Sequence, residues 1–427
     1  MGLGVGTGGS VERFPCRARG AGSAPVYHPP PVSKRPKAPA PPAILFTGFE
    51  PSGDDHASAV IAVLRERHPD LKMYAWGGPK MAAAGAEVVE QTGADAVMGV
   101  PGLAKIREHR HINERIAAWL RDHPITLHVP VDSPAANFPI CKITRARGAR
   151  VMHLVAPQVW AWASWRVRKL RRLTDHVCCL LPFEEKWFRD RGIRATFVGH
   201  PLFDRELDLE AIDREIAGWP SGRPRLALMP GSRPAEMEKN FPILLEAFRR
   251  LAREHADMIG IVAATTRPVE ARLREIAAAS GGWPDKLEMV HGQTDAVVRW
   301  CDLALVVSGT VTLQVAKQAK PMVIVYKSSK LMYSLVGRWI VSTPFFSLPN
   351  LIAGERIVPE LIPHFAGADA LVDEALGLLE RPERAEQQRR ALRRISEAFR
   401  GHHAASAAAA EIERLAGLPT TPAPAGA

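Results

Sequence analysis

The chain has 427 residues, of which 46% are hydrophobic and 24% charged, and its formal net charge is +11. One ordinary hydrophobic core does not organise a chain of this length, so two domains are expected, and the composition excludes fibrous and mainly disordered proteins. The positive charge indicates an anionic partner: a phosphorylated small molecule, an acidic membrane face or a nucleic acid.

The five cysteines show no CxxC spacing, which argues against a zinc site and a disulfide framework and favours a reducing cytoplasm. No stretch approaches the roughly 20 apolar residues of a membrane span, and the first residues lack the basic and apolar regions of a secretory signal. Residues 1–42, rich in Gly, Pro and Arg, and the tail 417–427 cannot bury enough apolar surface to fold, so both are expected to be disordered.

From residue 43 to 217, short apolar runs alternate with helical segments, as in a parallel sheet that is buried on both faces. The expected strands read AILFTGF (43–49), LKMYAWGG (71–78), ITLHVPVD (125–132), ARVMHLVAP (149–157), HVCCLLPF (176–183) and ATFVGHPLFD (195–204).

After a linker near residues 215–224, a second alternating series covers residues 218–395. Its strands are expected at RLALMPGSR (225–233), MIGIVAAT (258–265), LEMVHGQ (287–293), LALVVSGT (303–310) and MVIVYKS (322–328). A terminal helix over 396–416 could pack back on the first domain. The predicted fold is α/β, with two Rossmann-like doubly wound domains facing an interdomain cleft that holds the ligand.

Polar residues follow two strands of the first series. The turn EPSGDD places Glu50, Ser52, Gly53 and Asp54 at a strand end, where the acids repel phosphate and suit hydroxyl-bearing ligands or helix capping. Asp132 ends another strand and is expected at the same edge of the sheet. A carboxylate there can act as a general base, although the pattern alone equally permits a capping or salt-bridging role.

Two loops of the second series place Gly and Ser between a strand and a helix. They contain Gly231, Ser232 and Arg233 in one case, and Ser308, Gly309 and Thr310 in the other. Main-chain N–H groups and the helix dipole can hold a phosphate there, and Arg233 can grip its oxygens. Simple chain turns are the alternative for each loop alone, but the pair favours a nucleotide diphosphate site.

The segment VWAWASWRVRK combines three indoles, Trp160, Trp162 and Trp165, with the cations that follow them. At least one indole is expected in the core. By contrast, His109 and His111 lack acidic or sulfur ligands nearby and indicate a solvated helix face rather than a metal site. The basic segment near the C-terminus is expected to be an amphipathic helix, and no nucleic-acid-binding motif is present.

Taken in order, EPSGD, GGPKM, VMGV, VDSP with NF, VWAW, LPFE, GHP, PGSRPAE, SGT and SLPNLIAG resemble the motifs of the lipid-A-disaccharide synthase family. The resemblance runs from about residue 43 to 400. It implies a GT-B glycosyltransferase that needs no metal or other cofactor. Such an enzyme transfers a diacylated glucosamine from UDP to the 6-hydroxyl of diacylglucosamine 1-phosphate with inversion, releasing UDP. It implies no nucleic-acid partner and a cytoplasmic enzyme attached peripherally to the inner, anionic face of the cytoplasmic membrane.

The resemblance also implies roles for individual residues. Asp132 would be the catalytic base, with Glu50 as a second catalytic residue. The implied UDP-binding residues are Gly231, Ser232, Arg233, Ser308, Gly309, Thr310, Gln314 and Asn350, and the implied acceptor-binding residues are Ser52, Gly53, Asp54, Gln158, Trp160 and Arg166.

Six positions depart from the family pattern: Phe49 replaces Gly, Pro51 replaces Ala, Ala135 replaces Asp, Ala156 and Gln158 each replace Ser, and Gln314 replaces Glu. Two alternatives therefore stay open. One is a divergent GT-B enzyme that uses a UDP-sugar with another acceptor, and the other is a non-catalytic relative that binds UDP-sugars. A UDP-sugar epimerase is less expected, because no matching set of paired acids is present.

Overall fold

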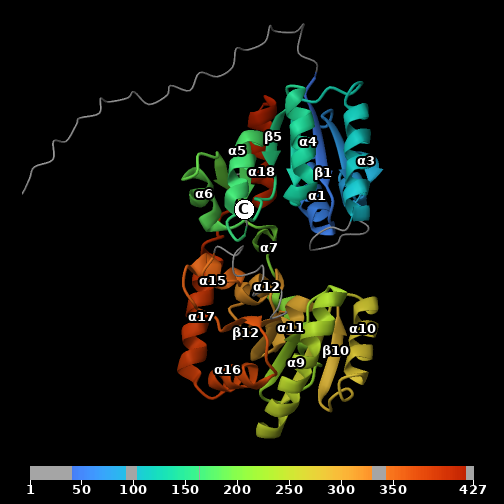
Figure 1. Ribbon diagram of the computed structural model, residues 1–427. Coiled ribbons are helices and arrows are strands. Elements are labelled where there is room, and N and C mark those ends of the chain that lie inside the picture. Colours follow the sequence, from blue (N-terminus) through green and yellow to red (C-terminus); the bar gives the residue numbers. More distant parts are fainter. Residues whose placement is uncertain (1–40, 93–102, 163, 329–342, 420–427) are drawn as a thin grey trace, which may run out of the picture. The chain divides into compact units, whose positions relative to one another are not determined.

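A computed structural model describes residues 41–92, 103–162, 164–328 and 343–419 (Figure 1). The predictions for most of the leader and of the tail, and the VMGV motif, lie outside these residues. No helix in the described ranges combines the length and the apolar character needed to cross a bilayer.

The first sheet has seven parallel strands in the order β3-β2-β1-β4-β5-β6-β7. The strands are β1 (Ala43–Gly48), β2 (Lys72–Gly77), β3 (Glu87–Gln91), β4 (Leu127–Val131), β5 (Arg150–His153), β6 (His176–Cys179) and β7 (Ala195–Phe197). The helices between and after them are α1 (Pro51–Arg67), α2 (Pro79–Ala83), α3 (Leu103–Trp119), α4 (Pro134–Ala146), the 3-10 turn η1 (Ser164–Arg166), α5 (Val167–Leu173), α6 (Pro182–Arg189), α7 (Pro201–Asp204) and α8 (Leu209–Ile216).

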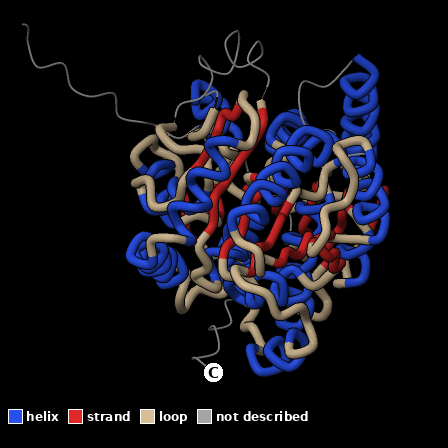
Figure 2. Tube along the Cα trace, turned by 90° about the horizontal axis from the view of Figure 1, so that it is seen from below, coloured by secondary structure: helices blue, strands red, loops and turns tan. Residues whose placement is uncertain are grey.

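The second sheet has six parallel strands in the order β10-β9-β8-β11-β12-β13. These are β8 (Arg225–Met229), β9 (Ile259–Ala264), β10 (Leu287–His291), β11 (Leu303–Val307), β12 (Met322–Lys327) and β13 (Glu360–His364). Its helices are α9 (Pro234–Glu254), α10 (Arg267–Ala278), α11 (Thr294–Trp300), α12 (Val311–Lys317), α15 (Leu348–Ala353), α16 (Asp369–Leu379) and α17 (Pro382–Glu397). Figure 2 shows strands of the sheets lying between helices.

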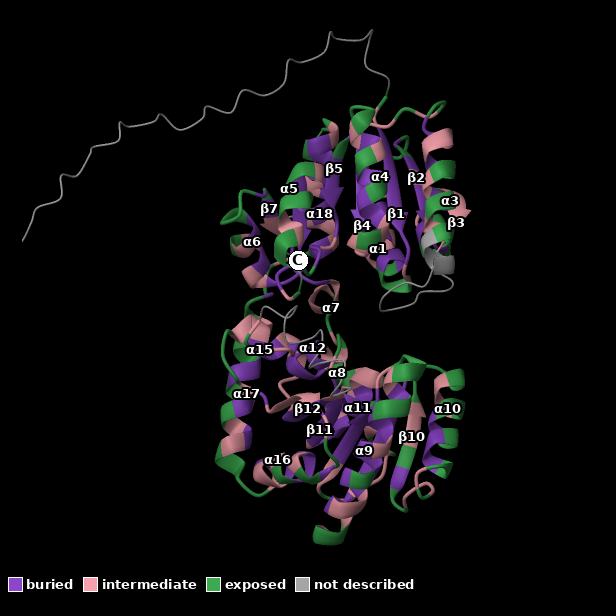
Figure 3. Ribbon diagram, viewed as in Figure 1, coloured by how far each residue is buried: buried purple, intermediate pink, exposed green. Residues whose placement is uncertain are grey.

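Alternate residues of one strand enter different hydrophobic clusters, which explains the uninterrupted apolar runs in the sequence. Ile44 and Phe46 of β1 pack with α1 residues such as Ile61, whereas Leu45 packs with Ile112 of α3. Burying each such side chain contributes roughly 1.5–3 kcal/mol. Figure 3 shows the resulting pattern, with buried strands beneath helices that are exposed on one side.

The last helix, α18 (Ala404–Ala416), packs against α1 rather than against the second sheet. Ala408 and Ile412 belong to the same hydrophobic cluster as Ile44. The buried Glu413 carboxylate adds polar contacts, because it lies 3.0 Å from His68 Nε2 and 3.4 Å from Arg67 Nη1. The chain therefore returns to its first sheet after completing the second.

The strand order reverses once in each sheet, and the reversal points are where doubly wound folds bind ligands. In the first sheet it falls between β1 and β4, and in the second between β8 and β11. The predicted motifs follow these same four strands. The fold thus places Glu50 with Asp132 at one reversal point, and the Gly231 loop with the Ser308 loop at the other.

Candidate active site

Two carboxylates meet at the reversal point of the first sheet. Strands β1 and β4 pair in register up to Gly48 and Val131, so the residues that follow them leave the sheet side by side. The Ser133 hydroxyl donates a hydrogen bond to Glu50 Oε1 at 2.6 Å, which connects the two strand ends. The predicted proximity of Glu50 and Asp132 is therefore confirmed.

The turn after β4 has an unusual backbone. Asp132 has a φ of 48° and Ser133 a φ of 34°, both in the left-handed region that residues with a Cβ rarely adopt. This conformation costs roughly 1–2 kcal/mol per residue, so the surroundings must hold it. Asn137 does so, because its Nδ2 donates to the carbonyls of Val131 at 3.2 Å and Asp132 at 3.0 Å.

The Asp132 side chain is half-buried, and its pKa lies above the ordinary value for aspartate. Burial is the largest cause, and the negative charge of Glu50 adds to it. The Ser133 N–H, which donates to the carboxylate, and the positive charge of Arg233 both act in the opposite direction. A carboxylate with a raised pKa at a strand end has the properties of a general base.

The other predicted residues of this turn differ in their exposure. Ser52 is exposed in the first turn of α1, and Gly53 is buried. Asp54 is buried too, and its carboxylate accepts the N–H groups of Lys80 and Met81 at the start of α2, at 3.0 and 2.9 Å. Asp54 is thus tied to the neighbouring helix.

The tryptophan segment divides into a buried and an exposed part. Trp160 is only 4% exposed, and its Nε1 donates to Glu184 Oε1 at 2.8 Å. Burial raises the pKa of Glu184 to about 7. The expectation that one indole is core is therefore confirmed, and Trp160 offers almost no surface to an acceptor.

Gln158, directly before this segment, is exposed. Trp162 and Trp165 are 43% and 63% exposed, and the Arg166 guanidinium stacks over the Trp162 ring at 4.5 Å. Exposed indoles beside unneutralised cations can contact apolar chains and anions together.

At the reversal point of the second sheet, the loop after β8 contains Gly231 and Arg233. Gly231 has a φ of 90°, and a Cβ on it would lie 3.2 Å from Glu236 Oε2, so this position requires glycine. Ser232 is exposed. Arg233 pairs at 3.0 Å with Glu236, whose side chain is largely buried, but the guanidinium itself is half-exposed, so an anion can reach it from the solvent side.

The loop after β11 is open. Gly309 and Thr310 are exposed, Ser308 is half-buried, and a Cβ built on Gly309 would meet no atom within 4 Å. Thr312 Oγ1 donates to the Gly309 carbonyl at 2.7 Å and shapes the start of α12. This leaves room for a diphosphate close to the main chain, while Gln314 lies half-buried one turn further on.

Asn350 is fully buried. Its Oδ1 accepts the N–H groups of Ile357 and Val358, both at 2.9 Å, and its Nδ2 donates to the Val358 carbonyl at 2.9 Å. Asn350 thus holds the loop between α15 and β13, and its amide has little capacity left for a ligand.

Sequence reasoning missed Thr47, Ser133, Asn137 and Glu236 as parts of these sites. Asn137 and Ser133 stand inside the VDSP and NF motif, which is the signal that could have identified them. Glu236 had a signal of the same kind, because it follows PGSR in the sequence within the stretch PGSRPAE. Thr47 carries no comparable signal, because only the fold brings it to Asn137, 90 residues away.

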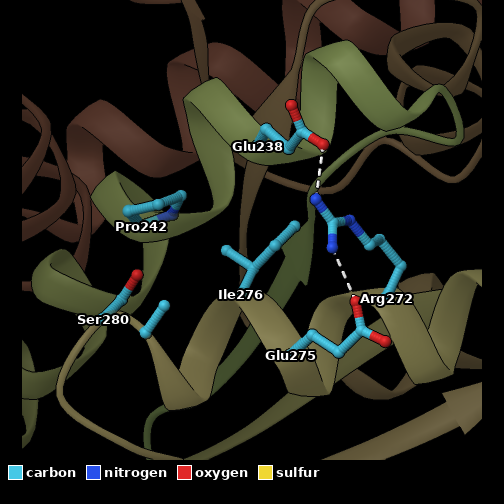
Figure 4. Close-up of a pocket in the computed structure, with 7 residues that line it drawn as sticks. Glu238, Pro242, Arg272, Glu275, Ile276 and Ser280 are labelled. Carbon is cyan, nitrogen blue, oxygen red and sulfur yellow. Dashed lines mark hydrogen bonds and ion pairs between the residues drawn. The ribbon is translucent and has the colours of Figure 1, made fainter.

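A hollow of about 240 Å³ lies between α9 and α10 (Figure 4). Arg272 bridges Glu238 and Glu275 across it, with both contacts at 2.6 Å. Two carboxylates for one guanidinium repel a diphosphate, so this hollow is no candidate for the donor site. Over the described ranges, no group of three or more His, Cys, Asp or Glu side chains could hold a metal ion.

Residues 44–412 match the family model described as lipid-A-disaccharide synthetase. The lipid-A-disaccharide synthase of Geobacter sulfurreducens is 33% identical over 360 residues, which cover 83% of this chain and 92% of the relative. The enzyme of the same name from Myxococcus xanthus is 36% identical over 325 residues, which cover 75% and 84%.

Among solved structures, the glycotransferase of kitacinnamycin has a TM-score of 0.59 at 17% identity and covers 89% of this chain and 100% of that chain. The UDP-GlcNAc 2-epimerase from Neisseria meningitidis, bound to UDP-GlcNAc, has a TM-score of 0.57 at 12% identity and covers 87% and 99%. These likenesses confirm the predicted fold class, that of two Rossmann-like sheets.

Proposed function

The chain belongs to the lipid-A-disaccharide synthetase family, and from this premise we propose that it is an inverting glycosyltransferase of lipid A biosynthesis. Its donor is a UDP-linked diacylated glucosamine, its acceptor is diacylglucosamine 1-phosphate, and its products are the lipid A disaccharide and UDP. The observation that carries the proposal is the half-buried Asp132 carboxyl with a raised pKa at the first reversal point.

In the proposed mechanism, Asp132 accepts the proton of the acceptor's 6-hydroxyl while the hydroxyl oxygen attacks the anomeric carbon. The bond from that carbon to the UDP oxygen breaks in the same step, and UDP leaves with the electron pair. One such displacement inverts the anomeric centre. Glu50, fixed by Ser133, contributes a second carboxylate that keeps the pKa of Asp132 high.

We assign donor binding to residues 218–395. Main-chain N–H groups of the loops at Gly231–Ser232 and Gly309–Thr310, with the Ser308 hydroxyl and the Arg233 guanidinium, would stabilise the charge of the departing diphosphate. The Ser308 N–H does not contribute, because it donates to the Val325 carbonyl at 3.1 Å. The half-exposed guanidinium of Arg233 supports its contact with phosphate oxygens. Gln314 would bond the ribose, and Asn350 would act through the loop that it holds.

We assign acceptor binding to residues 43–217. The side chains of Ser52 and Gln158 are exposed and that of Arg166 is partly exposed, so all three can contact a sugar phosphate. Gly53, Asp54 and Trp160 are buried, so they would support this surface from beneath.

The acylated substrates imply attachment to the inner, anionic face of the cytoplasmic membrane, and the segment from Trp162 to Arg172 suits that role. It has two exposed indoles and the cations Arg166, Arg168, Lys169, Arg171 and Arg172, with no acidic residue among them. None of these cations is in an ion pair with another described residue, whereas three arginines of α17 share the acid Glu386. Unpaired cations beside indoles are typical of surfaces that contact anionic lipid.

Two other functions remain compatible with the departures from the family pattern. Phe49 fills the start of the EPSGD turn and packs edge-on against His109 at 5.5 Å, which supports an altered acceptor. Gln314 in place of Glu supports a relative that binds a UDP-sugar without transferring it.

The test is release of UDP from UDP-diacylglucosamine by the purified chain, measured with and without diacylglucosamine 1-phosphate. Release only with this acceptor is expected. Release with an unrelated acceptor would favour the divergent transferase, and UDP binding without any release would favour the non-catalytic relative.

A further inference from the structure

We propose that Asn137 and Thr47 are positioning residues for Asp132: a buried chain of hydrogen bonds from β1 through α4 holds the turn that presents the Asp132 carboxyl. The inference rests on the proposed function in one respect, the role of Asp132 as the base. The hydrogen bonds of these two residues do not reach the Asp132 carboxyl, because Asn137 bonds the main-chain carbonyls of Val131 and Asp132, and Thr47 bonds Asn137.

The chain of bonds has a defined direction at Asn137. Its Nδ2 donates to the carbonyls of Val131 and Asp132, and its Oδ1 accepts the Thr47 hydroxyl at 2.6 Å. Turning the amide over would put Oδ1 against two carbonyl oxygens, which repel it. The hydroxyl proton of Thr47 is therefore committed to Asn137.

Because its proton is donated to Asn137, the Thr47 hydroxyl can only accept a hydrogen bond from His128. His128 Nε2 lies 2.8 Å from the same hydroxyl oxygen and must be the donor, so the ring carries its proton on Nε2. Nδ1 is then an acceptor that faces the Thr144 hydroxyl, 3.1 Å away, and the Ile140 and Cys141 carbonyls lie within reach of the same hydroxyl proton, at 3.1 and 3.2 Å. Complete burial keeps His128 neutral and lowers its pKa to about 3, in agreement with this assignment.

The four residues have no exposed surface, and the bonds that join Asn137, Thr47 and His128 each have one donor and one acceptor. A buried network of satisfied polar groups fixes geometry more firmly than packing alone. It ends on the two carbonyls that precede and form the left-handed turn at Asp132. Thr47 also lies three residues before Glu50, so the same network anchors both strand ends that carry carboxylates.

The experiment compares Thr47→Val, which keeps the shape but removes the hydroxyl, with Thr47→Ser, which keeps the hydroxyl. We expect Thr47→Val to lower kcat by about 10²-fold, because a small displacement of a reacting group has an effect of this size. The KM for the UDP-sugar should stay within about twofold of the wild-type value, since the donor loops are untouched. Thr47→Ser should restore most of kcat.

The matched control is Thr196→Val on β7 of the same sheet, which loses a hydrogen bond to Glu411. It should lower the unfolding temperature and leave kcat unchanged. In an Asp132→Asn background, Thr47→Val should lower kcat no further, because it acts only through Asp132. Should Thr47→Val fail to fold, Asn137→Ala tests the same link from α4.

Wild-type kcat in Thr47→Val, an equal loss in Thr196→Val, or an additional loss in the Asp132→Asn background would each overturn the positioning role. Full activity of Asp132→Asn would instead overturn the base assignment of the proposed function. The two failures are therefore distinguishable.

Discussion

The two reversal points use opposite means to prepare for a ligand. At the first, the polar groups are already bonded to one another: Ser133 to Glu50, Asn137 to the Asp132 turn, and Asp54 to α2. At the second, Gly309 has no atom near its missing side chain, and Arg233 is half-exposed. A base must be held at one place, whereas an anion is bound by main-chain donors that have to be left uncovered. Side chains should therefore dominate at the first point and backbone access at the second.

The strongest test of this comparison is Asp132→Asn. The amide cannot accept the proton, so kcat should fall by about 10²–10⁴-fold, the range that a general base supplies. Affinity for UDP, measured by calorimetry, should stay near wild type because the second reversal point is unchanged. A variant that loses UDP affinity together with activity would contradict the division of roles.

Arg233→Ala should have the next largest effect, and it should change the affinity for UDP. Loss of a charge-assisted contact to phosphate removes about 1.5–3 kcal/mol, so the affinity for UDP should fall by about 10- to 100-fold. Glu236→Gln is the control, because it frees Arg233 from its internal partner and should keep UDP affinity or raise it. Equal weakening by both variants would mean that the ion pair itself shapes the loop.

The same substitution at two glycines sharpens the contrast further. Gly78 follows β2, and a Cβ on it would clash with the carboxylate of Asp54, so Gly78→Ala should lower the free energy of unfolding by about 1–3 kcal/mol. Gly309→Ala meets nothing within 4 Å and should leave stability unchanged while weakening UDP binding severalfold, because the methyl group keeps phosphate from the main chain. Denaturant unfolding and UDP titration of the two variants decide the matter.

The alternation of apolar runs and helices predicts the interior strands, since strands buried on both faces leave a local signal. It misses β3 and β13, which lie at the sheet edges. β3 reads EVVEQ with a partly exposed surface, and β13 contains Pro363, so neither resembles a buried strand. The sequence also predicts Asp132 from its place after a strand. It cannot predict that Trp160 and Asn350 are buried and hydrogen-bonded within the fold. Tertiary packing brings Trp160 to Glu184, and Asn350 to the backbone of residues 357–358.

The smallest expected effect is on the pH dependence of kcat/KM. The direction in which its acid limb shifts should differ between variants at the first and at the second reversal point. Asp132 must be deprotonated to act, so activity is lost as pH falls through its raised pKa. Glu50→Gln keeps an acceptor for Ser133 but removes a negative charge that raises this pKa, so the acid limb should move to lower pH. Arg233→Ala removes a positive charge that lowers it, so the limb should move to higher pH. Shifts in the same direction, or a limb unchanged in both variants, would mean that another group limits the rate. Opposite shifts require that the charge of Arg233, at the second reversal point, acts on the carboxyl of Asp132, at the first. Such an interaction is expected if the UDP-binding loop and the general base act on the same reaction.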